Sequence, residues 1–170
     1  MPMLIDIRNE HRKVTDDPWH YFNQETTLES VVGSDVSHVL VPAQLWLDHA
    51  DALMESGKHI GVWLESDQPA EILEGKLDGL NLVALNFPKF MDGRAFTAAT
   101  TLRQRLNYQG EIRAIGEIIR DQLFYLKKCG FTSFELSDEL ALESVLSAFE
   151  DFRTNYQSTV EEPLPLFRRR

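Results

Sequence analysis

Residues 85–134 read LNFPKFMDGRAFTAATTLRQRLNYQGEIRAIGEIIRDQLFYLKKCGFTSF, and this stretch decides the fold class of the chain. Short apolar runs that predict strands alternate with longer amphipathic runs that predict helices. Parallel strands need a crossover connection of this kind, so the stretch predicts a parallel sheet covered by helices. Ligands of such sheets bind at the carboxyl ends of the strands, and the charged loops of this stretch emerge there.

The same pattern extends over most of the chain and predicts an α/β fold of five strand–helix units. The expected strands cover residues 38–41, 60–64, 82–85, 112–115 and 133–136, and the expected helices cover 44–55, 69–77, 93–106, 117–128 and 138–152. Spacings of roughly 20–30 residues suit right-handed βαβ crossovers. Two arrangements fit, an open doubly wound sheet and a partial (β/α) barrel, because a complete eight-unit barrel typically needs about 250 residues.

Both ends of the chain lie outside this repeat. Residues 3–22 contain a short alternating strand and an Asp17-Pro18 turn, and they predict a small hairpin or an irregular cover. We expect one α/β domain over residues 1–159, with the hairpin or cover in 1–35 and the βα units in 36–159. Residues 160–170 (VEEPLPLFRRR) predict an extended tail, and the alternative is a frayed terminus with a solubilising arginine cluster. The candidate partner-binding residues of the tail are Leu164, Leu166 and Phe167.

Composition narrows the possible functions. The 27 acidic and 17 basic residues give a net charge of −10, which disfavours nucleic-acid binding because that binding neutralises phosphates with Lys and Arg. No apolar run is long enough to span a membrane, and the first residues lack the apolar centre of a signal peptide, so we expect a cytoplasmic protein without membrane contact. The single cysteine, Cys129, excludes an internal disulfide. The five histidines are scattered, and we expect no metal site.

A candidate anion site lies where the segment FPKFMDGR, residues 87–94, leaves a strand and begins a helix. Helix N-termini attract anions through free N–H groups and the macrodipole. Lys89 and Arg94 add positive charge, Gly93 permits close approach, and Asp92 is the expected N-cap. Arg113 stands inside a predicted buried strand, where a guanidinium needs an acceptor. These five residues predict a site for a small anion or phosphate.

Structural explanations compete with this site. Arg113 can pair with Glu111 on its own strand or with Glu135 on the next, and Asp-Gly-Arg can simply start a helix with an exposed arginine. Cys129 follows two lysines that would lower the pKa of its thiol, whereas a buried cysteine is the alternative. The residues expected to support the site at the strand ends are Glu65, Asn86, Glu117, Arg120, Asp121 and Glu135.

Catalytic residues cannot be assigned from motifs. The sequence contains neither a GxSxG nucleophile elbow nor a dinucleotide or phosphate-loop fingerprint, and we expect no cofactor. The segments LNFPKFMDGRAFTAATTLRQRL and GEIRAIGEIIRDQLFYLKKCGFTSFEL, together with Asp17-Pro18-Trp19, resemble an uncharacterised bacterial family, the domain-of-unknown-function family numbered 934. Its members are labelled as oxidoreductases involved in sulfite reduction, and their genes commonly neighbour that of the sulfite reductase haemoprotein.

The resemblance implies a place in sulfate assimilation and cysteine biosynthesis, with the sulfite reductase haemoprotein or its electron donor as the expected partner. It implies no catalytic residues. The first hypothesis is an accessory or partner-binding protein of assimilatory sulfite reduction. The second is a small or degenerate enzyme that holds an anion at the strand ends. Sulfite reduction needs a haem or iron–sulfur centre. A cluster requires about four thiolates, and this chain has one cysteine. We therefore expect the protein to act by associating with a partner that carries out the redox step.

Overall fold

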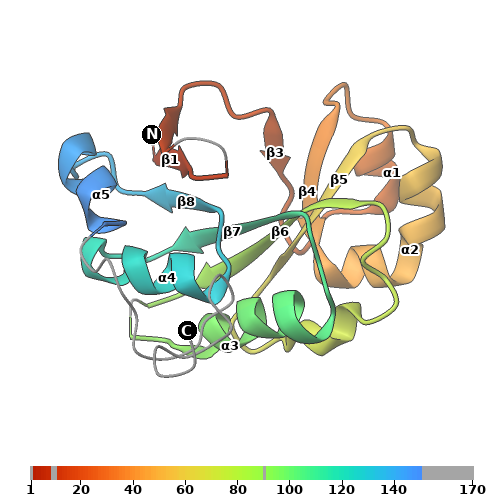
Figure 1. Ribbon diagram of the computed structural model, residues 1–170. Helices are drawn as coiled ribbons and strands as arrows, with labels where there is room; N and C mark the ends of the chain where they lie inside the picture. The colour runs from red at the N-terminus through yellow and green to blue at the C-terminus, as the bar shows by residue number, and fades with distance from the viewer. Residues whose placement is uncertain (1, 9–10, 90, 151–170) are drawn as a thin grey trace.

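The computed structural model describes residues 2–8, 11–89 and 91–150 as a mixed α/β fold. Its strands form one curled, mostly parallel sheet in the order β2-β1-β8-β7-β6-β5-β4-β3 (Figure 1). Strands β3 to β8 run parallel, and β1 is antiparallel to both β2 and β8. The strands are β1 (Met3–Asp6), β2 (Arg12–Val14), β3 (Trp19–Tyr21), β4 (His38–Pro42), β5 (His59–Leu64), β6 (Leu80–Phe87), β7 (Glu111–Gly116) and β8 (Ser133–Leu136).

The five predicted strands are confirmed as β4 to β8, and their parallel arrangement is confirmed as well. The predicted N-terminal hairpin exists as β1 and β2. Two features were not predicted: β1 extends the main sheet beside β8, and β3 forms its opposite edge beside β4. Residues 160–170, including Leu164, Leu166 and Phe167, lie outside the described residues.

Helices connect the parallel strands. Residues 44–55 and 93–106 are helical nearly as predicted, whereas the predicted helix over 69–77 shortens to one 3₁₀ turn because Gly75 adopts a left-handed φ of 72°. The last two helices begin several residues later than predicted. The helices are α1 (Leu28–Val32), α2 (Ala43–Glu55), η1 (Ala70–Leu73), α3 (Arg94–Thr100), the π-helical η2 (Thr101–Arg105), the 3₁₀ turn η3 (Arg120–Gln122), α4 (Leu123–Cys129) and α5 (Leu142–Ala148). Within the described ranges, none of them has the length and apolar character needed to cross a membrane.

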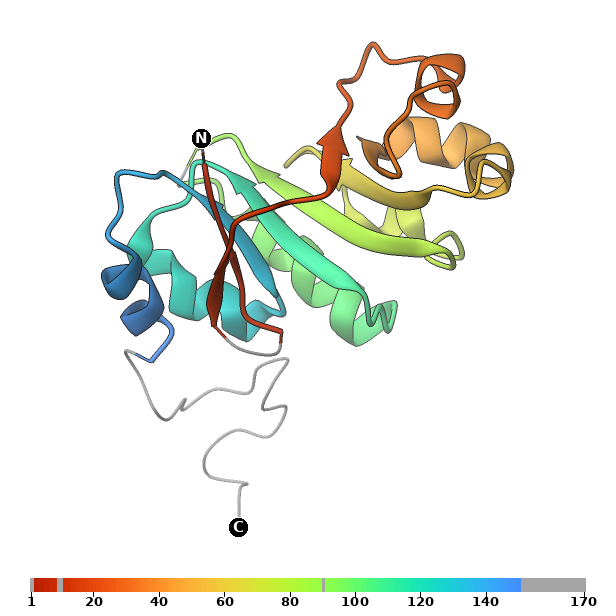
Figure 2. The ribbon, with the colours of Figure 1, turned by 90° about the horizontal axis from the view of Figure 1, so that it is seen from above.

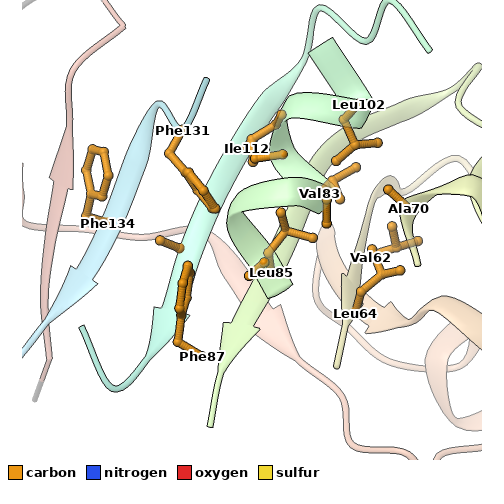
Figure 3. Packing of buried hydrophobic residues seen from close by; sticks show 14 of the residues in the cluster. Val62, Leu64, Ala70, Val83, Leu85, Phe87, Leu102, Ile112, Phe131 and Phe134 are labelled. Carbon is orange, nitrogen blue, oxygen red and sulfur yellow. The ribbon is translucent and has the colours of Figure 1, made fainter. Parts of the chain in front are cut away.

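The main hydrophobic core lies between the outer face of the sheet and these helices (Figure 3). Side chains alternate between the two faces of a strand, so Val62, Val83 and Ile112 all reach this core from neighbouring strands. Leu102 approaches the same cluster from η2. The inner face of the sheet carries a smaller cluster of Leu40, Trp63, Leu82, Ala84 and Ile115.

The curl of the sheet follows from one short connection. β2 and β3 form its two edges, yet only residues 15–18, which we call the strap, join them. The five Cα–Cα steps across the strap reach at most about 18 Å. The edges of a flat eight-stranded sheet would lie about 33 Å apart at the usual spacing of strands. The edges must therefore approach each other, and Figure 2 shows the N-terminal chain passing from one to the other. The result is a half-barrel, the partial-barrel alternative of the sequence prediction.

Candidate functional site

The inner, concave face of the half-barrel gathers polar side chains from strands that are distant in the sequence. On β7, Ile112 and Ala114 belong to the outer core, so Glu111 and Arg113 point to the inner face. Both are buried, with Arg113 only 4% exposed. A buried guanidinium and a buried carboxylate are stable only when their hydrogen-bonding groups find partners.

Arg113 finds its partners within the protein. Its Nη1 donates to Oδ2 of Asp17 in the strap at 2.7 Å, and its Nη2 donates to Oε1 of Glu111 at 3.0 Å. Glu111 also accepts a hydrogen bond from Ser133 Oγ at 2.5 Å and pairs with Arg8 at 3.1 Å. Burial lowers the pKa of Arg113, but the hydrogen bond to Asp17 and the charge of Glu111 outweigh it and raise that pKa overall. The structural pairing with Glu111 is therefore present, and a second acceptor, Asp17, lies 96 residues away in sequence.

The strap and the strand that follows it fill the lower part of the concave face. Gly61 lacks a side chain there, and a Cβ at this position would lie 3.0 Å from both Leu82 and the Trp19 ring. Trp19 also packs edge-on against His38, with ring centroids 5.2 Å apart. A remaining cavity of about 220 Å³ is lined by four carboxylates and three guanidiniums, namely Asp6, Asp16, Asp17, Glu111, Arg8, Arg12 and Arg113. The carboxylates therefore balance the positive charges of the three arginines.

The upper part of the concave face, at the carboxyl ends of the strands, has a different character. We call it the mouth and define it by Tyr21, Trp63, Glu65, Asn86 and Glu135. The rings of Tyr21 and Trp63 stack with centroids 5.1 Å apart and an interplanar angle of 28°. Trp63 is held in place because its Nε1 donates to the Phe22 carbonyl at 2.9 Å. Asn86 donates from Nδ2 to Oε2 of Glu65 at 2.7 Å.

Glu135 is the carboxylate of the mouth that accepts no hydrogen bond from the residues that the structure describes. The register pairs Arg113 with Ser133, so Glu135 lies one inward-facing step further toward the carboxyl end of the sheet. Of the two predicted acceptors of Arg113, Glu111 forms the salt bridge, and Glu135 on the adjacent strand interacts with Arg113 through its charge alone. Burial raises the pKa of Glu135, although the charge of Arg113 partly opposes this.

Gly116 at the end of β7 supports the geometry of the mouth. Its φ of 95° lies in the left-handed region that favours glycine. A Cβ at this position would overlap the Phe87 carbonyl and Oδ1 of Asn86. The glycine therefore allows the Asn86 amide to lie beside β7 while it binds Glu65.

The predicted anion-binding residues are divided between two places. Arg113 lies on the concave face, whereas Arg94 begins α3 beside a cleft of about 380 Å³ that the loop after β5 also lines. Arg94 donates from Nη2 to Asp92 at 2.6 Å and to Ser66 Oγ at 2.9 Å. These contacts lower the pKa of Asp92 well below its usual range. Lys89 is exposed. An anion site that uses both arginines is not assembled in this geometry, and anion binding at Arg94 stays a prediction.

Two details of the predicted helix start differ from expectation. The N-cap of α3 is Gly93 rather than Asp92. Asp92, the residue before the N-cap, accepts a hydrogen bond from the backbone N–H of Arg94 at 3.2 Å. Gly93 has a φ of −85°, which any residue adopts, so glycine is not required there by the backbone. The nearest atom to a Cβ at Gly93 would lie 3.8 Å away, an ordinary contact.

The predicted supporting residues also separate. Glu65 and Asn86 are hydrogen-bonded at the mouth, and Glu135 faces the same end of the concave face from β8, with β7 between it and Asn86. Arg120 instead donates to the carbonyl of Ser144 at 2.9 Å and thereby ties η3 to α5. Asp121 lies 3.8 Å from Arg120 with a side chain that is 84% exposed, and Glu117 is exposed as well. These last three residues stabilise or flank the loop after β7.

Cys129 is buried at the end of α4, and this confirms the alternative of a buried cysteine. Burial raises the pKa of its thiol, and hydrogen bonds with Tyr125 and Thr100 only partly oppose the rise. The predicted lowering by the neighbouring lysines is therefore wrong. Across the described ranges, no group of three or more His, Cys, Asp and Glu side chains is arranged to hold a metal ion.

Comparison with known proteins places these residues in context. A family model described as a bacterial protein of unknown function (DUF934) matches residues 61–167. The match covers well over half of the chain, from β5 onward, and includes Glu65, Asn86, Arg113 and Glu135. The strap and β3 precede it. No curated protein matches the chain.

Proposed function

The chain belongs to the bacterial DUF934 family, and on that premise we propose that it is an accessory, partner-binding protein of assimilatory sulfite reduction. The link to sulfite reduction comes from what the family resemblance implies. The observation that carries the binding role is the use of the concave face. Barrel enzymes place their reactive side chains at the carboxyl ends of several strands, where the loops leave room for a substrate. Here the buried charges Arg113 and Glu111 instead hold the strap of the same chain.

The remaining surface supports recognition. A net charge of −10 steers the protein toward a basic partner. Aromatic and Met side chains are enriched at interfaces, and three large apolar residues are exposed in the loops after β6 and β7 and on α4. Met91 in the loop after β6 is 81% exposed, Tyr125 on α4 is 59% exposed, and Ile119 is 41% exposed. Electron transfer would belong to the partner, because multi-electron reduction of sulfite is the chemistry of a haem or iron–sulfur cofactor.

The proposal is tested by capture of the expected partner. The full chain is immobilised, and binding of the purified sulfite reductase haemoprotein and of its electron donor is measured at low and high salt. We expect saturable binding that weakens as salt screens the charges. A chain without residues 163–170 tests the predicted role of the tail, and we expect it to bind more weakly with an unchanged melting temperature.

A deletion strain provides the matching cellular test. We expect slow growth on sulfate or sulfite and normal growth on cysteine, with rescue by the wild-type gene. Absence of binding to both partners together with normal growth on sulfite would overturn the proposal. So would reduction of sulfite by the purified chain alone.

A second candidate is a small or degenerate enzyme that holds a small anion, and the Arg94 cleft favours it. Asp92 and Ser66 fix two nitrogens of the Arg94 guanidinium, Nε and Nη2, at the edge of this cleft. Asp67 and Glu71 line the same cleft and would oppose an anion. Sulfate, sulfite and phosphate should raise the melting temperature more than chloride at equal ionic strength. Arg94→Met should abolish that difference, while the control Arg105→Met keeps it.

A further inference from the structure

The mouth differs in charge from the floor of the concave face. The cavity beneath it already contains four carboxylates against three guanidiniums. The mouth adds Glu65 and Glu135. Among the described residues, the Glu65 carboxylate accepts one hydrogen bond, from the neutral amide of Asn86, and the Glu135 carboxylate accepts none. Neither carboxylate forms a salt bridge within the described residues, although the charge of Arg113 acts on Glu135, and a cation at this half-buried surface would interact with both more strongly than in bulk water.

The aromatic pair gives this surface a flat wall. Tyr21 stacks on Trp63, which is 3% exposed and is held by its hydrogen bond to Phe22, so the Tyr21 ring is supported from behind. Tyr21 itself is 51% exposed and offers its other side to a ligand. Burial raises the pKa of Tyr21, and the charges of Glu65 and Glu135 raise it further, so both carboxylates act electrostatically on its phenol group.

An aromatic face beside carboxylates is the combination that recognises a guanidinium group. The planar guanidinium stacks on aromatic rings and donates paired hydrogen bonds to carboxylates, whereas an ammonium ion does neither in the same geometry. We propose that the mouth binds a guanidinium group, presented as an arginine side chain by a partner protein. Tyr21 stacks on the guanidinium plane, and Glu135 and the free oxygen of Glu65 accept its hydrogen bonds.

Asn86 and Gly116 position this site. The amide of Asn86 binds one oxygen of Glu65, Oε2, and leaves Oε1 for the ligand. Gly116 makes room for that amide, because any Cβ at residue 116 would overlap it. This inference rests on the proposed partner-binding function and adds to it the chemistry that the partner must present.

The test uses the full chain and three short capped peptides that differ in one central residue. The residue is arginine, lysine or citrulline, the last being a neutral isostere of arginine. Binding is measured by calorimetry and by the fluorescence of tryptophan. We expect the arginine peptide to bind about ten-fold more tightly than the citrulline peptide, which corresponds to about 1.4 kcal/mol, and more tightly than the lysine peptide. Free arginine amide in a parallel titration separates a small-molecule site from one that needs a peptide.

Variants locate the binding. Glu135→Gln and Tyr21→Ala should each weaken the arginine peptide about five- to ten-fold. Tyr21→Phe keeps the ring and should bind nearly as wild type. Glu139→Gln is the matched control, because Glu139 is an acid of the loop after β8 outside the mouth. Melting curves verify that every variant is folded.

Several results would overturn the inference. They are equal binding of the arginine and citrulline peptides, an equal loss in Glu135→Gln and Glu139→Gln, or tight binding of free arginine amide without any gain from the peptide. Capture of the haemoprotein by a chain that ignores arginine peptides would reject this site and leave the proposed function intact. Specific peptide binding without capture of either sulfite-reduction partner would do the reverse.

Discussion

Replacing Asp17 with asparagine removes the charge that holds the strap to the centre of the sheet. Asp17 accepts hydrogen bonds from Arg113 at 2.7 and 3.3 Å. Hydrogen bonds to charged groups contribute about 1.5–3 kcal/mol each. The Asp17 side chain is 32% exposed, so solvent screening moves the estimate toward the low end. Arg113 also keeps Glu111 as a partner. We therefore expect the free energy of unfolding to fall by about 1–2 kcal/mol, which lowers the melting temperature by about 2–8 °C in a chain of this size.

Urea unfolding measures this change, and a double-mutant cycle assigns it to the pair. Arg113→Met leaves Glu111 bonded to Ser133 and Arg8, so it removes the guanidinium without orphaning the buried acid. The two substitutions together should cost less than their sum by about 1 kcal/mol, because they interrupt the same interaction. Asp16→Asn, one residue earlier in the strap, is the control and should change stability by less than about 0.5 kcal/mol. Equal effects of Asp16→Asn and Asp17→Asn, or strictly additive effects in the cycle, would refute the reasoning.

Three further predictions concern other residues of the same face and core. Gly116→Ala should lower the free energy of unfolding by more than about 2 kcal/mol, because residue 116 combines a left-handed backbone with overlap at the Phe87 carbonyl. Gly57→Ala is the control and should cost only about 1–2 kcal/mol, because residue 57 has the left-handed backbone without the overlap. Similar losses of stability in the two variants in thermal unfolding would contradict this. The raised pKa of Glu135 means that its carboxyl favours the folded state below the ordinary value of 4.5 and that this contribution is lost as pH rises through the folded-state value. Glu135→Gln should therefore be more stable than wild type at pH 8, with the advantage disappearing near pH 4, and a pH-independent difference would argue against it. Cys129 is buried with a raised pKa, so a thiol reagent should modify it only at the rate of unfolding in urea; rapid modification of the folded protein would disprove this.

The parallel sheet could be predicted from the sequence because each strand carries its own signal. Residues 60–64, 82–85 and 112–115 are short apolar runs separated by helical stretches, and helices on the outside require the strands between them to be parallel. The placement of Glu111 and Arg113 on one face followed from the two-residue period of a strand. Local rules were sufficient there, since the residues concerned lie close together in the sequence.

The contacts that shape the concave face could not be predicted in the same way. Asp17 and Arg113 are 96 residues apart, and they meet only because the strap brings one edge of the sheet toward the other. β3 is a three-residue strand whose hydrogen bonds, rather than its sequence, define it. Tyr21 stacks on Trp63 because β3 pairs with β4 in the folded sheet, and this pairing cannot be predicted from three residues. The Asp-Pro-Trp tripeptide is the sequence feature that marks this region. The contacts of Asp17 and Trp19 form only when the sheet curls, so the tripeptide alone does not predict them.

Closure by a strap also decides which part of the half-barrel can act on other molecules. A complete barrel surrounds its ligand with eight loops and presents charges from the strands beneath them. Here the strap occupies the floor, and Arg113 and Glu111 are engaged in holding it. The mouth lies above this floor, and its side chains are two carboxylates, an amide and a stacked aromatic pair. Such groups are suited to bind a projecting cationic side chain, because they supply an aromatic surface and hydrogen-bond acceptors at fixed positions. Under the binding role proposed above, recognition takes place at the mouth, and Tyr21 couples it to the closure of the sheet because the strap places β3, the strand that carries Tyr21, at the edge of the sheet.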